Sequence, residues 1–196
     1  MLFRRRHKLT FLANLRGWVW PKSGWRRAGI YVWHRLARLP GTPHSIAAGF
    51  ACGVAVSFTP LLGLHILLGC GLALLVRGNI LATVIGTVAG NPWTFPLFFA
   101  LTGSVGSAIL GGDMIAEIPV WDWDAIFMSP ADYLLKFVPV VFPLIVGAVP
   151  VATVAWFLVY LVFKGLITKY RARRRSRADA AEKIEVKSEE SPNDQR

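Results

Sequence analysis

Two short polar segments interrupt long apolar stretches of this sequence, and they contain the side chains best suited to hold a polar ligand. The candidate polar site comprises Thr59, His65, Asn91 and Thr94. A proline directly follows Thr59, and another follows Asn91. Proline removes a backbone donor and ends or kinks a helix, so each segment predicts a helix break with a capping side chain. A helix that begins inside a bilayer presents N–H donors and partial positive charge, which transporters use to bind substrates.

The two breaks allow two interpretations, and the sequence leaves both open. If the breaks meet, the four side chains line a polar site near the middle of a membrane. If each cap only satisfies its own helix, the breaks are proline kinks, which are common in membrane helices. The kink interpretation is the simpler of the two, and a lone histidine such as His65 is more often structural than functional.

The spacings typical of enzymes and metal sites are missing from the sequence. There is no nucleophile elbow, phosphate-binding loop or zinc pair, so we expect no enzymatic activity, no catalytic residue, no metal and no cofactor. No Asp, Glu, Lys or Arg lies deep inside an apolar stretch, where proton relays and voltage sensors place them. Cys52 and Cys70 both lie in apolar sequence and are expected to be small buried hydrophobic residues.

Three long uncharged stretches predict an integral membrane protein. Hydrophobic residues make up 54% of the 196 residues, and charged residues make up only 17%. No Lys, Arg, Asp or Glu occurs between Arg38 and Arg77, between Arg77 and Asp113, or between Lys136 and Lys164. Each stretch exceeds the roughly 20 apolar residues that a helix needs to cross a bilayer. The predicted fold class is all-α, with about four helical crossings and Pro-broken or re-entrant helices.

The net charge of +11 comes from basic residues that cluster at the two ends of the chain, in Arg4–Arg38 and Lys164–Arg177. Basic residues beside membrane segments stay in the cytoplasm and attract anionic headgroups. We therefore expect a multi-pass protein of the bacterial inner membrane with both termini cytoplasmic. The expected partners are membrane lipids, a homo-oligomer is one option, and nucleic acid is not expected.

Composition divides the chain into five predicted segments. They are a basic aromatic interfacial segment at 1–41, two broken apolar helical blocks at 42–112, an acidic non-cytoplasmic loop at 113–136, a final membrane helix at 137–165, and a basic, then disordered cytoplasmic tail at 166–196. A helix over about 24–39 would place apolar and basic residues on opposite faces, which is typical of the membrane interface. The expected lipid headgroup contacts are Arg26, Arg27, Arg35, Arg38, Trp25 and Trp33.

Within the apolar blocks, turn residues predict helical arms at about 43–58, 60–77, 80–90 and 92–111. Each of four polar residues precedes a proline and predicts a helix N-cap: Thr42, Thr59, Asn91 and Ser129. Arg77 and Gly78 predict a cation in the last turn of the second arm, followed by a left-handed glycine. Because Arg77 favours the cytoplasmic side, the first block is expected to form a hairpin. Three prolines are expected to interrupt the first half of the final helix.

Small residues recur every four positions along three arms, a pattern that lets membrane helices approach closely. The predicted ladders are Gly49, Gly53 and Ser57, then Gly86 and Gly90, then Gly103, Ser107 and Gly111. We interpret these ladders as packing surfaces, because nothing in them suggests chemistry.

Several segments near the breaks resemble an uncharacterised bacterial membrane-protein family, domain of unknown function 2062. The similar segments read Leu39-Pro40-Gly41-Thr42-Pro43-His44-Ser45, then Ser57-Phe58-Thr59-Pro60 with Gly63 and His65, then Arg77-Gly78-Asn79, then Gly90-Asn91-Pro92-Trp93-Thr94-Phe95-Pro96. The resemblance covers about residues 16–165. It implies a bacterial inner-membrane protein and brings no established activity, so no functional residue is carried over.

Two functional hypotheses follow from these patterns. The first is a component for small-solute transport or lipid handling that uses the paired interrupted helices. The alternative is a non-catalytic membrane anchor or envelope organiser, whose basic aromatic N-terminal segment binds anionic lipid or a protein partner.

Overall fold

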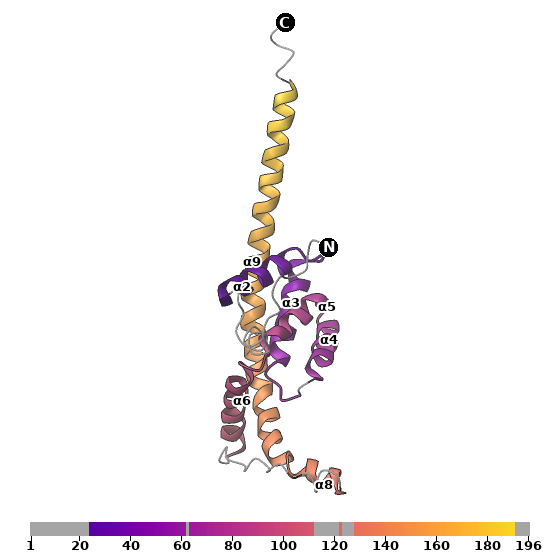
Figure 1. Ribbon diagram of the computed structural model, residues 1–196. Helices are drawn as coiled ribbons and strands as arrows, with labels where there is room; N and C mark the ends of the chain where they lie inside the picture. Colours follow the sequence, from indigo (N-terminus) through magenta and orange to yellow (C-terminus); the bar gives the residue numbers. More distant parts are fainter. Residues whose placement is uncertain (1–23, 62, 112–121, 123–127, 191–196) are drawn as a thin grey trace, which may run out of the picture. The chain divides into compact units, whose positions relative to one another are not determined.

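The computed structural model describes residues 24–61, 63–111, 122 and 128–190, and it contains helices but no strand within them. The helices are α2 (Gly24–Ala37), α3 (Pro43–Val56), α4 (His65–Leu75), α5 (Ile80–Gly86), the 3₁₀ helix η1 (Thr87–Ala89), α6 (Phe95–Leu110), α8 (Pro130–Leu135) and α9 (Val138–Glu190) (Figure 1). The all-α prediction is confirmed. Most of the predicted acidic loop lies outside the described residues.

The chain divides into two units, Met1–Arg38 and Leu39–Arg196. In the first unit the structure describes α2, which matches the helix predicted over 24–39 within two residues. His34 and Arg35 lie in its last turn, where positive charge is favourable to the helix dipole.

Helix α3 begins where the Thr42-Pro43 pair predicted. The Thr42 side chain accepts a hydrogen bond from the Ser45 backbone N–H at 3.1 Å, and Pro43 occupies the first helical position, where no N–H is needed. Ten of the 14 residues of α3 are buried. This helix therefore forms the core of the second unit, between α9 on one side and the α4–α5 pair on the other (Figure 1).

The turn between α4 and α5 differs in detail from the prediction. Arg77, and not Gly78, adopts the left-handed conformation, with φ of 54°. The Gly78 N–H donates to the Ala73 carbonyl and the Arg77 N–H to the Leu74 carbonyl, which is the Schellman pattern. Gly78 is needed for another reason, because a Cβ there would lie 2.8 Å from the backbone nitrogen of Gly49.

Asn79 holds this turn against the beginning of α3. Its side-chain oxygen caps α5 through the Ala82 N–H at 3.1 Å, and its side-chain amide donates to the Pro40 carbonyl at 3.0 Å. Its backbone N–H donates to the Ser45 carbonyl at 2.7 Å. The α4–α5 turn and the start of α3 therefore lie side by side, as the predicted hairpin requires.

The helices before the second break are short. Helices α3, α4 and α5 have 14, 11 and 7 residues, or about 21, 17 and 11 Å at 1.5 Å per residue. The hydrocarbon core of a bilayer is about 30 Å thick. None of these helices alone has the length of a full crossing.

The first two small-residue ladders are packing surfaces, as predicted, and they pack against each other. A Cβ at Gly49 would overlap the backbone of Asn79, and a Cβ at Gly53 would overlap the Thr83 carbonyl oxygen. A Cβ at Gly90 would lie 2.7 Å from the Ser57 side chain. Helix α3 therefore contacts the segment formed by α5 and η1 with almost no side chain between the two backbones.

The third ladder is only partly correct. Gly106 of α6 and Gly147 of α9 form the close contact, since a Cβ at either residue would overlap backbone atoms of the other helix. Gly103 and Ser107 are buried in α6. Gly111 instead ends α6 in the left-handed conformation, with φ of 71°, and a Cβ there would meet nothing.

Helices α3 and α6 follow one another along α9, and both run antiparallel to it. His44 at the start of α3 contacts Tyr160, and Cys52 near its end contacts Trp156. Farther toward the start of α9, Gly147 packs on Thr102 of α6. The ring of Phe58, just after α3, stacks on Phe98 of α6 at 4.2 Å between centroids. The α4–α5 pair separates these two helices in the sequence, and it packs on the side of α3 that faces away from α9 (Figure 1).

Helix α9 is longer and more continuous than predicted. It has 53 residues and includes Pro143 and Pro150 without ending at either. It continues to Glu190 through the segment predicted to be disordered from Ala178 onward. The sequence there is rich in Ala, Glu, Lys and Arg, which have high helix propensity, so low hydrophobicity alone was a poor indicator of disorder.

Small residues fill the interior, and large apolar residues cover the outside. The fully buried apolar residues include Ala47, Ala48, Ala51, Cys52 and Ala82. The exposed ones include Leu67, Leu75, Leu97, Val149 and Leu161. Among the described residues, one helix is long and apolar enough to cross a bilayer: α9 from Val138 to Lys183, whose most apolar window has a mean hydropathy of 2.3 and is only 11% buried.

Candidate functional site

The first break lies between α3 and α4, and its hydroxyl groups bond to the end of α3. The Ser57 hydroxyl donates to the Gly53 carbonyl at 2.9 Å, and the Thr59 hydroxyl donates to the Val56 carbonyl at 2.7 Å. Helix α4 begins only at His65, six residues after Thr59. The prediction that Thr59 caps the following helix is therefore wrong, because its side chain satisfies the helix before it.

His65 is the first residue of α4 and stabilises the loop that precedes it. Its Nδ1 accepts the Gly63 backbone N–H at 3.2 Å, across a turn in which Gly63 has φ of 87°. The edge of its ring faces Phe95 of α6, with 6.4 Å between ring centroids. The imidazole thus joins its own turn to the second break.

The second break is a compact turn held by Asn91 and Thr94. The Asn91 side-chain oxygen accepts the backbone N–H groups of Trp93 at 3.0 Å and Thr94 at 3.1 Å. The Thr94 hydroxyl donates to the Ala89 carbonyl at 2.6 Å and accepts the Asn91 N–H at 3.0 Å. Helix α6 begins at Phe95, so Asn91 caps the turn and not the first residue of the helix.

The two breaks do lie together, through ring contacts and the packing of Gly90 on Ser57. Gly90 packs on Ser57, Phe58 stacks on Phe98, and His65 meets Phe95. Thr59, Asn91 and Thr94 each bond to the backbone of their own break. The candidate polar residues are therefore neighbours whose hydrogen bonds stabilise the helix ends.

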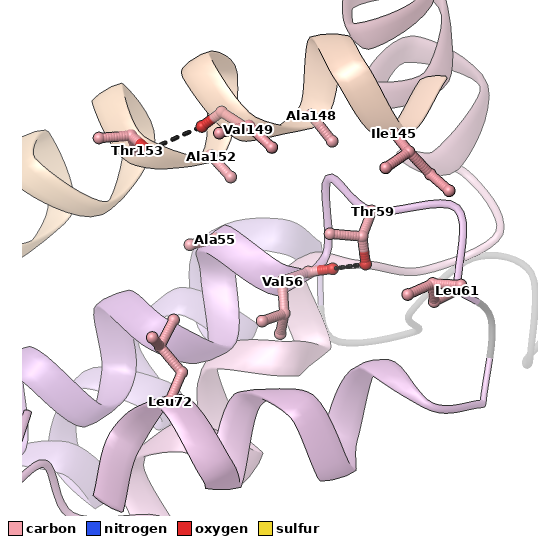
Figure 2. A pocket seen from close by; sticks show the side chains of 10 residues that line it. All are labelled: Ala55, Val56, Thr59, Leu61, Leu72, Ile145, Ala148, Val149, Ala152 and Thr153. Carbon is pink, nitrogen blue, oxygen red and sulfur yellow. Dashed lines mark hydrogen bonds between the residues drawn. The ribbon is translucent and has the colours of Figure 1, made fainter. Parts of the chain in front are cut away.

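A groove lies on another side of the first break, and the sequence analysis did not anticipate it. Its volume is about 410 Å³, within the usual range for small-molecule sites. It is lined by Ala55, Val56, Thr59, Leu61, Leu72, Ile145, Ala148, Val149, Ala152 and Thr153. Figure 2 shows α9 along one wall and, opposite, the end of α3, the following loop and Leu72 of α4.

The groove offers almost no polar group to a ligand. The Thr59 hydroxyl donates to the Val56 carbonyl, and the Thr153 hydroxyl donates to the Val149 carbonyl at 2.7 Å (Figure 2). Val149 is 66% exposed, whereas Ala148 at the base is 2% exposed. The groove therefore opens sideways from the apolar stretch of α9, and its chemistry fits a hydrocarbon chain.

The sequence did contain a weak signal for this groove. Ile145, Ala148, Val149 and Ala152 follow helical spacing along α9, and all four are small or β-branched. This pattern is also that of an ordinary packing face, so only the position of α4 reveals a space beside it. Of the predicted polar residues, the groove includes Thr59 alone.

The predicted headgroup contacts lie in the first unit. Arg26, Arg27, Arg35 and Arg38 are exposed, and Trp33 is half-buried. The Trp25 side chain lies outside the described residues. Arg35 donates to the Tyr31 hydroxyl at 3.5 Å, a weak bond within one helix turn.

Neither cysteine is paired, and Cys52 accepts a hydrogen bond from the Trp156 indole N–H at 3.2 Å. Cys52 is buried as expected, whereas Cys70 is only partly so. In the described part of the chain, no group of three His, Cys, Asp or Glu side chains is close enough to hold a metal ion.

Comparison with known proteins gives one match. No curated protein and no solved structure shows significant similarity to the chain. A family described as an uncharacterized protein conserved in bacteria (DUF2062) matches residues 26–176, which include all the helices of the hairpin, α6 and most of α9. The chain therefore belongs to this bacterial family.

Proposed function

We propose that the chain is a lipid-handling protein of the bacterial inner membrane, and that the groove beside α9 accepts one acyl chain of a membrane lipid. The observation that carries this proposal is the sideways-opening apolar groove, in which both hydroxyl groups are already bonded to backbone carbonyls. A polar solute would leave its own donors and acceptors unpaired there, at a cost of about 1–3 kcal/mol each. A hydrocarbon chain has no such groups.

The distribution of apolar residues supports placement in a membrane. A core helix of a soluble protein is mostly buried, but the most apolar window of α9 is only 11% buried. Large exposed side chains such as Leu75 at 82% and Leu67 at 71% would be unfavourable in water. Small residues at helix contacts and large ones outside are typical of membrane proteins.

The helix lengths support two full crossings in place of the four that composition predicted. In this proposal α9 makes one crossing, and α3 and α6 together make the other, because they follow each other along α9. Helix α4 runs from the first break toward Arg77, and α5 runs back from there toward the second break. Helices α3 and α6 have 14 and 16 residues, or about 21 and 24 Å, enough in series to span the hydrocarbon core.

This arrangement places the groove near the middle of the bilayer. Thr153 precedes Lys164, the first cation after the apolar stretch of α9, by 11 residues, or about 16 Å. Half of the hydrocarbon thickness is about 15 Å. A lipid whose headgroup lies at the level of Lys164 would extend its chain to the groove.

Photo-crosslinking in membranes tests this assignment. We would incorporate a phospholipid with a photoreactive group at the middle of one acyl chain and map the crosslinked peptides of the full-length protein. The proposal predicts crosslinks concentrated at Ala148–Thr153. The Ala152→Phe variant, which fills the groove, should lose most of this signal.

Two matched variants control this experiment. Val154→Phe adds a similar ring to a residue that is 59% exposed and outside the groove, so it should leave the crosslinks unchanged. Thr153→Val removes a hydroxyl that bonds only to its own helix and should also be neutral. Crosslinks spread evenly around α9 and unaffected by Ala152→Phe would refute the groove as a lipid site.

The alternative role as an anchor or organiser is favoured by a different observation. Helix α9 continues from Lys164 to Glu190, 27 residues or about 40 Å beyond its apolar stretch. Arg173, Arg174, Arg175 and Arg177 are exposed there. Removing residues 173–196 should abolish an organising role and leave acyl-chain crosslinking intact.

A further inference from the structure

Three polar side chains meet where α3 begins and where the apolar stretch of α9 ends. The Nδ1 of His44 lies 2.9 Å from the Tyr160 hydroxyl, and the imidazole meets the phenol ring edge to face at 5.6 Å. The Lys164 ammonium lies 5.3 Å from the centre of the same ring. On the other side of Tyr160 along α9, Trp156 stacks on the phenol at 5.0 Å between centroids. The Tyr160 side chain therefore contacts both the His44 imidazole and the Lys164 ammonium group.

We infer that His44, Tyr160 and Lys164 form a binding site for the anionic phosphate of a lipid headgroup. This inference rests on the proposed function, because it assigns the headgroup of the lipid whose chain occupies the groove. It names a class of lipid, the anionic phospholipids, that the groove itself does not select. All phospholipids carry a phosphate, but the choline cation of phosphatidylcholine would be repelled by Lys164, whereas a headgroup of net negative charge is attracted.

The hydrogen bond between His44 and Tyr160 leaves a donor for such a ligand. If the hydroxyl donates to Nδ1, the neutral imidazole carries its proton on Nε2. If the imidazole is protonated, Nδ1 donates to the hydroxyl and Nε2 still carries a proton. In these two states Nε2–H can donate to a phosphate oxygen, and a bound anion favours them over the neutral tautomer whose proton is on Nδ1. His44 is exposed, so this nitrogen is accessible.

No acidic residue lies near these groups in the sequence. There is no Asp or Glu from residue 1 to residue 112, and none between Asp132 and Asp179. In the described part of the chain, no carboxylate pairs with His44 or Lys164. Lys164 rests on an aromatic face in place of an acidic partner, which leaves its three donors available to an external anion.

The three side chains also have the right position relative to the groove. Tyr160 follows Val149 by 11 residues, and Ala55 follows His44 by 11 residues. Eleven residues are about three helical turns, or about 16 Å, so each pair lies on one face of its helix. The proposed headgroup site and the groove therefore lie on the same faces of α3 and α9, one half-bilayer thickness apart.

Arg171 and Lys169 are not part of this site. Arg171 donates to the carbonyl groups of Leu39 and Gly41, so its guanidinium is already occupied. Lys169 is exposed and belongs to the same helix as Lys164. It supplies a matched control, because its removal lowers the net charge by the same amount without touching Tyr160.

Native mass spectrometry of the purified full-length protein tests the inference. Micelles would contain equal amounts of phosphatidylglycerol and phosphatidylcholine with identical chains, and the ratio of the two bound lipids would be measured. The wild type should retain mainly phosphatidylglycerol. The double variant His44→Phe and Lys164→Gln should lower the ratio about tenfold, because it removes the cation that attracts the anionic headgroup and repels choline. Tyr160→Phe keeps the ring but frees His44, so it should lower the ratio by less.

The outcomes separate the site from the groove. If Lys169→Gln lowers the ratio of bound phosphatidylglycerol to phosphatidylcholine as much as the double variant does, the preference reflects only the general positive charge of the protein. That result would overturn the inference. An unchanged ratio in the double variant would overturn it as well, even if Ala152→Phe reduces retention of both lipids and thereby supports the groove. If Ala152→Phe changes nothing, the proposed function fails while the headgroup preference stands. A preference removed by millimolar inorganic phosphate would assign the site to free phosphate and overturn the lipid assignment. Thermal unfolding of each variant verifies that it is folded.

Discussion

The side-chain amide of Asn79 donates a hydrogen bond of 3.0 Å to the carbonyl oxygen of Pro40, across 39 residues of sequence. The same side chain caps α5 through the Ala82 N–H. One residue thus fixes both the start of α5 and the return of the hairpin to the beginning of α3. This relationship holds the turn between α4 and α5 against the start of α3.

Two substitutions of Asn79 should distinguish its capping of α5 from its hydrogen bond to Pro40. Asn79→Ala loses the cap and the Pro40 bond, and each loss should cost about 1 kcal/mol of unfolding free energy. Asn79→Asp keeps the capping oxygen and loses only the donor to Pro40, so it should be less destabilising. Denaturation of the detergent-solubilised protein measures both. Equal stability of wild type and Asn79→Ala would contradict the bridging role.

The contact between α3 and α5 should not tolerate a single methyl group. Gly53→Ala places a Cβ against the Thr83 carbonyl oxygen and 2.7 Å from the Thr87 nitrogen, both of them backbone atoms. We expect it to destabilise the protein by at least about 1–3 kcal/mol. Gly71→Ala is the matched control in α4, because a Cβ there meets nothing within 4 Å. That variant should be neutral or slightly stabilising, since alanine has the higher helix propensity. Thermal unfolding of the two variants side by side gives the comparison.

Arg171 should be irreplaceable by lysine. Its guanidinium donates to the Leu39 carbonyl at 2.9 Å and to the Gly41 carbonyl, so it fastens the segment before α3 to α9. A lysine ammonium is a point charge and does not reproduce this two-pronged geometry. Arg171→Lys should lower the unfolding free energy by about 1–3 kcal/mol. Arg173→Lys, at an exposed residue, serves as the control. An equal loss of unfolding free energy in both variants would argue against a special role for the Arg171 hydrogen bonds.

Much of the packing could be predicted from the sequence, because close helix contacts depend on residue size alone. The small residues Gly49, Gly53 and Ser57 mark the face of α3 that a second backbone can approach closely. In the structure, the segment formed by α5 and η1 lies against this face. Thr42 and Pro43 likewise determine a helix start through short-range bonds. In both cases, the residue type that the local sequence pattern calls for is also the one that the folded structure needs at that position.

The breaks could not be predicted with the same accuracy, because a hydroxyl can bond either the helix before it or the helix after it. Thr59 was expected to cap the following helix but bonds to Val56. Helix α4 begins only at His65, after a turn in which Gly63 has a positive φ, so its first turn is too far along the chain for Thr59 to cap. The groove was missed for a related reason, since the alanines that line it carry no signal of their own.

The central claim is that the first break ends within the membrane, beside the groove, and that the chain crosses the bilayer twice. Cysteine accessibility at position 64 tests it most directly, in a variant whose two native cysteines are replaced by alanine. Leu64 lies in the break and is 56% exposed. With Asp122→Cys labelled from outside and Arg173→Cys labelled only after permeabilisation, the account predicts that Leu64→Cys resists a membrane-impermeant maleimide from both sides. Ready labelling of Leu64→Cys from outside intact cells would show that α3 and α4 are full crossings and would contradict the account.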